Sequence, residues 1–386
     1  MWGKKKIIEN NFINICVQAF IDNTHITPKI DFSLADLNWE YFIEKSLRQG
    51  IIPILHYVLS REEMNVTIPE EAWKKLEDTY YSIASVNILF KEELDRVLFS
   101  LRDVGVEVIV LKGIALGMTT YPDFSLRPMN DVDLLVRKED FKRVREKLLG
   151  MGYEDQTSGP EDFLKKIAKN VTMDIDVHTD LLNVTRVKTR GKAHKLNIED
   201  FWKRAVTIER DGQLFKMLSP EDNLLDLCLH LVLHHGFSKL IWAIDIACFI
   251  KHHNGILDWS RFLKECEKSR SSKIVYYAFL YVKNILGLTI PNNILPGLKP
   301  KGLAEFESVI FKWLLRYNLS DGVKYFLTLL LLEGLIDKIN FLREIIVPTP
   351  GALRRIYSIP ESKGILPYYI HHFKRAINFC LLFIKG

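Results

Sequence analysis

Apolar residues recur at spacings of three and four over residues 37–59 and 69–101, and this period predicts helices in the first hundred residues. The acidic residues that follow Pro69 suit the first turn of a helix. A second helical region is predicted from Ser219 to about residue 335, because Ser219-Pro220-Glu221-Asp222 has the order of an N-cap followed by proline and acids. Helices therefore flank a different middle region.

The middle region has the pattern of strands. Residues 106–111 form a short β-branched run that predicts a buried strand, and residues 131–136 predict a second. Residues 173–178 alternate strictly and predict a third. Between the strands, residues 114–120 and 138–149 favour helices, so residues 105–215 are expected to form an α+β unit.

These patterns predict an α+β fold with a small mixed β-sheet core, N-terminal helices and a larger C-terminal helical domain. The expected domains are an N-terminal helical segment (residues 1–102), a sheet core (103–218), a helical domain (219–335) and a basic tail (336–386). The tail is expected to be less regular, because prolines stand at positions 348, 350, 360 and 367.

Composition is that of a folded protein: 48% of the 386 residues are hydrophobic and 26% are charged. The net charge is +5, and residues 337–386 alone hold eight basic and three acidic residues, which equals that excess. Aromatic residues alternate with the bases there, and such a tail suits contact with an anionic membrane surface or RNA. The favoured interpretation of the tail is a terminal helix packed on the body.

The five cysteines include no CxxC pair, which argues against a disulfide framework or a zinc site and favours a reducing cytoplasm. No signal peptide is recognised, and the longest apolar run is too short to cross a bilayer. We therefore expect a cytoplasmic protein without a transmembrane segment, or one peripheral to the membrane.

Candidate chemistry lies on the second and third strands. Alternation places Asp131 and Asp133 on one face, about 7 Å apart at the backbone. Adjacent carboxylates repel unless a cation or a proton joins them, and Mg²⁺ binds one or two carboxylates together with phosphate oxygens. Asp174, Asp176 and His178 share a face of the third strand, and one of these acids would complete a two-metal site.

The first strand ends at Lys112-Gly113, where a glycine allows backbone N–H groups to approach a phosphate at a helix N-terminus. Lys112 is either a phosphate contact or an ordinary lysine at a strand end. Arg127 is either a bidentate phosphate contact or the partner of one of the aspartates. His230 and His234 have the spacing of helical zinc ligands, but no glutamate follows His230, and helix packing is expected instead.

The chain resembles the uncharacterised nucleotidyltransferase family of the DNA polymerase beta-like superfamily. The resemblance covers roughly residues 35–290 and is carried by five motifs, which are Leu111-Lys112-Gly113, Tyr121-Pro122, Leu126-Arg127-Pro128-Met129-Asn130-Asp131-Val132-Asp133-Leu134-Leu135-Val136, Gly152-Tyr153 and Asp176-Val177-His178. The helical stretch 230–247, with Trp242 and Asp245, is also similar to this family.

The resemblance implies metal-dependent transfer of a nucleotide from an NTP, with ATP expected, to an unidentified acceptor. It assigns Mg²⁺ (or Mn²⁺) to Asp131, Asp133 and Asp176, with Asp176 preferred over Asp174 as the third acid. Substrate binding is expected at Lys112, Gly113, Arg127, Asn130 and His178. One departure is that Ile114 follows Gly113 where the superfamily usually has glycine or serine, so triphosphate binding would rely on the backbone, Lys112 or Arg127.

Three other classes remain open from the sequence. A glycosyltransferase also holds a metal and a nucleotide-sugar with Asp-x-Asp, although it would place a larger nucleotide-binding domain before that motif. A nucleotidyltransferase-like antitoxin or AMP-transferring regulator would modify a partner protein. A non-catalytic binding module is the third possibility. The acceptor is open among protein hydroxyls, RNA ends, peptides, and sugar or lipid intermediates.

Overall fold

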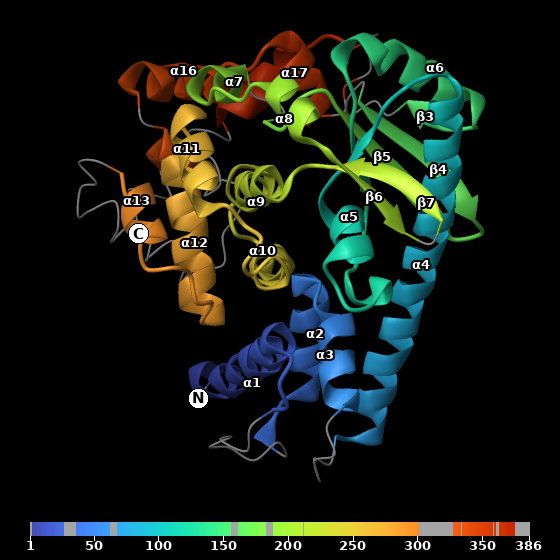
Figure 1. Ribbon diagram of the computed structural model, residues 1–386, viewed down its shortest axis with the longest axis vertical. Coiled ribbons are helices and arrows are strands. Elements are labelled where there is room, and N and C mark those ends of the chain that lie inside the picture. Colours follow the sequence, from blue (N-terminus) through green and yellow to red (C-terminus); the bar gives the residue numbers. More distant parts are fainter. Residues whose placement is uncertain are drawn as a thin grey trace.

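The computed structural model describes residues 2–26, 36–61, 68–155, 161–182, 188–210, 212–300, 327–332, 334–357, 359 and 363–374. Its fold is α+β, as the sequence predicts, with one mixed sheet and helices on both its N-terminal and C-terminal sides (Figure 1). No described helix combines the length and the apolar character that a bilayer crossing requires.

The described residues of the N-terminal segment form four helices, which are α1 (Trp2–Asp22), α2 (Trp39–Gln49), α3 (Ile52–Ser60) and α4 (Glu70–Asp103). Gly50 separates α2 from α3 with φ of 70°, a left-handed conformation that glycine adopts at low cost. Helix α4 is 34 residues long and extends from the other N-terminal helices to the sheet (Figure 1).

The described residues form a seven-stranded sheet in the order β3-β4-β5-β2-β1-β7-β6. The strands are β1 (Ile109–Val110), β2 (Val132–Leu135), β3 (Glu154–Asp155), β4 (Asp162–Ala168), β5 (Val171–His178), β6 (Val206–Arg210) and β7 (Gln213–Met217). Three of them coincide with the predicted strands, although β1 is shorter than expected, and the other four were not predicted. The pairs β2–β5 and β1–β7 are parallel and the remaining pairs are antiparallel.

Short helices connect the strands, and further helices follow the sheet. The connecting helices are α5 (Lys112–Thr119), η2 (Phe124–Leu126), η3 (Lys138–Asp140), α6 (Phe141–Gly150), α7 (Lys188–Ala193) and α8 (Ile198–Arg204). The later elements are α9 (Pro220–Leu229), the π-helix η4 (His230–His234), α10 (Leu240–His252), α11 (Trp259–Lys268), α12 (Ser272–Leu286), α13 (Ile294–Leu298), α16 (Leu335–Ile346) and α17 (Pro350–Ile356). Part of the last fifty residues is therefore more regular than the prolines suggested.

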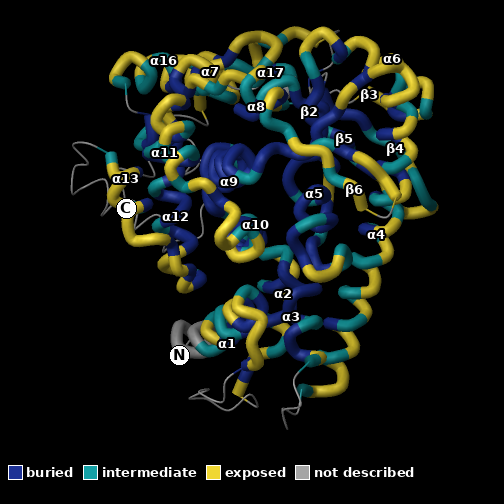
Figure 2. Tube along the Cα trace, in the orientation of Figure 1, coloured by how far each residue is buried: buried dark blue, intermediate teal, exposed yellow. Residues whose placement is uncertain are grey.

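The two faces of the sheet pack into different cores. Val132, Leu134 and Val177 belong to a cluster with α4 and α6, whereas Leu135 belongs to a larger cluster with the N-terminal and later helices. Helices α5 and α9 are buried at the centre of the molecule (Figure 2). The face of the sheet that carries Leu135 is therefore turned towards α9. The candidate carboxylates of β2 and β5 project from this face.

Candidate active site

The candidate site is built on the parallel pair β2–β5. In this pair Asp133 stands directly beside Asp176, and Leu135 stands beside His178. Because side chains two residues apart share a face, Asp133, Asp176 and His178 project from the face that is turned towards α9. One ligand atom from each of the three lies within 4.8 Å of the others, and this spacing is compatible with a metal site.

Asp133 is the best-connected member of this group. Its Oδ1 accepts hydrogen bonds of 2.6 Å from Lys112 Nζ and 2.6 Å from His178 Nε2. His178 Nε2 also lies 3.4 Å from Asp176 Oδ2. Burial by itself would raise the pKa of Asp133, but Lys112 and His178 outweigh it and hold this pKa well below its usual range. Asp133 is therefore a carboxylate that is already charged and fixed in place.

Lys112 enters the site because of an unusual backbone. It is the first residue of α5, directly after the β1 segment, and its φ is 53°, a left-handed value that is uncommon for a residue with a Cβ. Its side chain is only 5% exposed. Burial would lower the pKa of the amine, but Asp133 and Asp226 outweigh it, so the pKa is raised and Lys112 stays charged. The buried amine supplies a positive charge between the acids.

Asp176 and Asp131 differ in environment. Burial, followed by the charge of Asp133, raises the pKa of Asp176 to about 6. Asp131 directly precedes β2 and is exposed, and it is not part of the group that Asp133, Asp176 and His178 form. Although the side chain reaches solvent, crowding by neighbouring protein atoms, followed by the charge of Asp133, raises the pKa of Asp131. Asp131 thus lies at the rim, within the electrostatic reach of the site.

Gly113 and Arg127 contact each other, which the sequence did not predict. A Cβ on Gly113 would lie 2.9 Å from Arg127 Nη1 and 3.1 Å from Arg127 Cζ, so the guanidinium packs over the glycine. Arg127 donates to Asp245 of α10 through Nε at 2.9 Å and Nη2 at 2.7 Å, and Tyr121 donates to the same carboxylate at 2.7 Å. The sequence offered a site aspartate as the alternative partner; the actual partner is Asp245.

The other two polar candidates lie to either side of these residues. Asn130 is exposed on the loop that leads into β2, next to Asp131. Asp174 shares the face of Asp176 two residues earlier on β5, where it pairs in register with Leu164 of β4. The group of potential metal ligands includes Asp176 and does not include Asp174.

Asp226 of α9 is a site residue that the sequence analysis missed. It is 1% exposed, and its Oδ2 has no hydrogen-bond partner within the described part of the chain. Burial raises the pKa of Asp226 to about 6, and Lys112, Asp133 and His178 also affect it, so Asp226 faces the carboxylate group across the interface of α5 and α9. The sequence signal was an acid within the apolar run Leu224-Leu225-Asp226-Leu227.

His230 and His234 follow Asp226 along the chain, at the end of α9. They begin and end η4, a π-helix, which is a local distortion that is common at functional sites. Burial lowers the pKa of both imidazoles well below 6.5, and Lys112 lowers both further, so both are neutral. His230 Nδ1 and His234 Nε2 are buried without a hydrogen-bond partner among the described residues. Neutral imidazoles therefore border the site, whereas the sequence analysis expected these histidines to pack within a helix.

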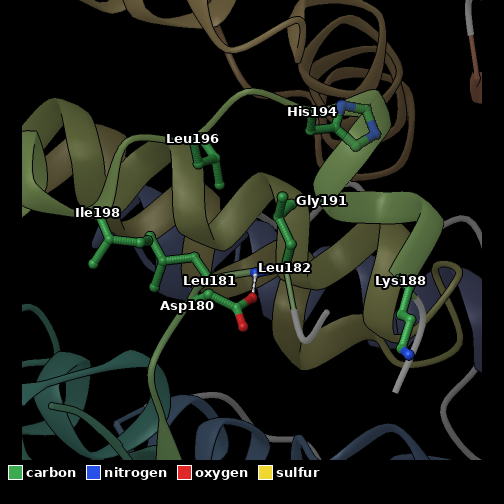
Figure 3. Close-up of a pocket in the computed structure, with 8 residues that line it drawn as sticks. All are labelled: Asp180, Leu181, Leu182, Lys188, Gly191, His194, Leu196 and Ile198. Carbon is green, nitrogen blue, oxygen red and sulfur yellow. Dashed lines mark hydrogen bonds between the residues drawn. The ribbon is translucent and has the colours of Figure 1, made fainter. Parts of the chain in front are cut away.

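A cavity of about 520 Å³ lies beyond the end of β5 (Figure 3). Its wall is formed by Asp180, Leu181, Leu182, Lys188, Gly191, His194, Leu196 and Ile198. Asp180 follows His178 by two residues, and Arg190 Nη2 of α7 donates to Leu233 O of η4 at 2.5 Å. The cavity therefore follows closely after β5, and α7, which contributes to its wall, is bonded to η4.

The donor set of the central group fits a divalent cation. Two carboxylates in register on adjacent strands suit Mg²⁺, while the imidazole is a ligand that Mn²⁺ tolerates better. Lys112 and His178 both bond to Asp133 Oδ1, so a cation at this carboxylate would compete with them for that oxygen.

Comparison with known proteins agrees with the geometry. A family model described as Uncharacterised nucleotidyltransferase matches residues 35–287, well over half of the 386-residue chain. None of the curated proteins matches the chain. The match contains every residue of the β2–β5 site, together with Asp226 and Asp245, and the chain therefore belongs to the uncharacterised nucleotidyltransferase family.

Proposed function

We propose that this protein is a Mg²⁺-dependent nucleotidyltransferase that transfers the nucleotide of an NTP, ATP in the first instance, to an acceptor with release of pyrophosphate. The observation that carries the proposal is the register pair Asp133–Asp176 with Lys112 and His178 bonded to Asp133. Asp133 and Asp176, with Asp131 at the rim, would hold Mg²⁺ or Mn²⁺. The bound cation would neutralise phosphate charge.

The side chains of the site have distinct roles in this proposal. Lys112 keeps Asp133 ionised and, as a buried cation, favours a triphosphate nearby. Asp176 accepts the proton of the acceptor hydroxyl. The hydroxyl oxygen then bonds to the α-phosphorus, and the bond between the α-phosphorus and the oxygen of the leaving pyrophosphate breaks. His178 orients both acids. Arg127 acts indirectly, since Asp245 holds it and it packs over Gly113.

The acceptor is proposed to enter from the side of α7 and η4. The cavity there has leucine and isoleucine in its wall together with Asp180 and Lys188, which suits a molecule with an apolar part and a polar end. We further propose that the protein works in the cytoplasm, where its four described cysteines, all free, would stay reduced.

The proposal is tested with each α-labelled NTP, Mg²⁺ and cell extract, by following which component acquires label. We expect one NTP to label an acceptor with the wild type and none to do so with Asp176→Asn. Wild-type protein that binds no NTP in millimolar calorimetry but does bind a nucleotide-sugar would instead make the protein a glycosyltransferase. Label confined to one protein in the extract would identify a regulator that modifies a partner.

A further inference from the structure

Helix α16 exposes a continuous apolar face. Five side chains at helical spacing are strongly exposed, which are Leu335 (73%), Ile336 (74%), Ile339 (55%), Leu342 (41%) and Ile346 (38%). At 100° per residue they occupy one side of the helix. Isolated exposed apolar residues are ordinary, but a contiguous stripe of this kind marks an interaction surface.

The opposite face of α16 is anchored to the protein. Phe341 is 1% exposed and packs with Ala193 and Leu332. Glu344 accepts hydrogen bonds from the backbone N–H groups of Lys188 at 2.7 Å and Thr189 at 2.9 Å, at the start of α7. The helix is therefore held in one orientation, with its apolar stripe outwards.

Residues 366–374 are helical and repeat this arrangement. Leu366 (70%), Ile370 (54%) and Phe373 (51%) are exposed at spacings of four and three. On the other side of the helix, Tyr369 donates to Pro348 O at 2.6 Å, and His372 Nε2 lies 2.7 Å from Ile345 O at the end of α16. The helix of residues 366–374 is thus anchored at the end of α16. Helix α16 itself lies at the edge of the molecule together with α7 and α17 (Figure 1).

Basic side chains accompany the stripes. Arg343, Lys363 and Lys374 are exposed in the same segment. The acids between residues 334 and 374 that the structure describes are Asp337 and Glu344, and Glu344 already binds α7. The face therefore combines aliphatic side chains with positive charge.

The geometry points to an anionic lipid surface as the partner of this face, which we name the α16 face and define by Leu335, Ile336, Ile339, Leu342, Ile346, Leu366, Ile370 and Phe373. Aliphatic side chains enter the acyl boundary while basic residues meet lipid phosphates. RNA fits less well, because bases stack on aromatic rings and seven of the eight side chains are aliphatic. A second copy would bring like charges together.

The test is co-sedimentation of the full chain with vesicles of phosphatidylcholine alone and of phosphatidylcholine with phosphatidylserine. Binding is expected only to the anionic vesicles and should weaken with salt. The double variant Ile336→Ser/Ile339→Ser should bind at least tenfold more weakly, which corresponds to about 1.4 kcal/mol. The matched control is Phe99→Ser/Ile88→Ser on α4, whose side chains are 70% and 55% exposed, and it should bind as wild type.

Four results would overturn the inference: no binding of wild type to anionic vesicles, equal loss in both double variants, equal binding to neutral vesicles, or a concentration-dependent dimer that Ile336→Ser/Ile339→Ser abolishes. Binding to a single-stranded RNA oligonucleotide that the same variant weakens tenfold would replace lipid by RNA. All substituted side chains are exposed, and unfolding midpoints of the variants check that each one is folded.

Discussion

The charge balance of the site depends on single residues. Adjacent carboxylates need a cation or a proton between them, and in this protein Lys112 is a buried cation bonded to Asp133 at 2.6 Å. Asp131 lacks such a partner in the central group and lies exposed at the rim. The sequence suggested that Asp131 and Asp133 are equivalent members of one motif, whereas their surroundings are different.

Removing either charge should therefore have different effects on stability. Asp133→Asn leaves the buried Lys112 amine without its charged partner, and we expect a loss of about 3 kcal/mol in the free energy of unfolding. Asp131→Asn should not lower it, because the side chain is exposed and the substitution relieves repulsion by Asp133. Urea unfolding of both variants measures this. Equal free energies of unfolding for the two variants would show that the buried charge of Lys112 does not need Asp133 as its partner.

Asp226 gives a prediction with a pH signature. Its pKa is raised to about 6, so the folded state holds a proton that the unfolded state releases from about pH 4 upwards. The stability contributed by that proton is lost as the pH rises through this window. Asp226→Asn should therefore stabilise the protein by about 3 kcal/mol above pH 7 and by almost nothing below about pH 3.

Thermal unfolding of Asp226→Asn and wild type between pH 4 and 8 measures this difference. The matched control is Asp222→Asn on the same helix. The Asp222 carboxylate accepts two 2.8 Å hydrogen bonds from Arg204, so this substitution should destabilise the protein. A stability difference for Asp226→Asn that stays constant with pH would contradict the assigned protonation.

At the scale of elements, the start of α5 depends on the packing of Arg127 over Gly113. An added Cβ would stand 2.9 Å from Arg127 Nη1, and Asp245 keeps the guanidinium from moving aside. We expect Gly113→Ala to cost about 1–3 kcal/mol and to weaken NTP binding. In Asp245→Asn, which loosens Arg127, the added cost of Gly113→Ala should shrink, and a double-mutant cycle measures this coupling. If the effects of Gly113→Ala and Asp245→Asn on stability simply add, the contact with Arg127 is not the cause of the loss in Gly113→Ala.

The sequence predicted those elements whose pattern is local. Strands β2 and β5 were predicted because their apolar and acidic residues alternate, and the same alternation placed Asp133 on one face of β2 and Asp176 and His178 on one face of β5. The hairpin of β6 and β7 was missed because its strands are only five residues long and mostly exposed, and because apolar and polar residues do not alternate in β7. Asp226 and Asp245 join the site only through tertiary packing, which one sequence does not reveal.

At the scale of the molecule, the C-terminal segment is tied to the cavity wall. Glu344 of α16 binds the first N–H groups of α7, and α7 supplies Lys188 and Gly191 to the cavity. Glu344→Ala should therefore speed hydrogen exchange at the amides of Lys188 and Thr189 at least tenfold, because they lose their acceptor. Ile339→Ser, on the outward face, is the control. Unchanged exchange in Glu344→Ala would mean that α7 holds its shape without α16.

The pair of Arg127 and Asp245 joins the sheet to the helices that follow it, across 118 positions of sequence. Residues 103–218, which we propose as the sheet core, contain Arg127 and exclude its counterion. A gene fragment encoding that core would lack the carboxylate that neutralises Arg127 and the helix that covers it. Recombination between relatives would meet the same constraint, so functional chimaeras should inherit positions 127 and 245 from the same parent.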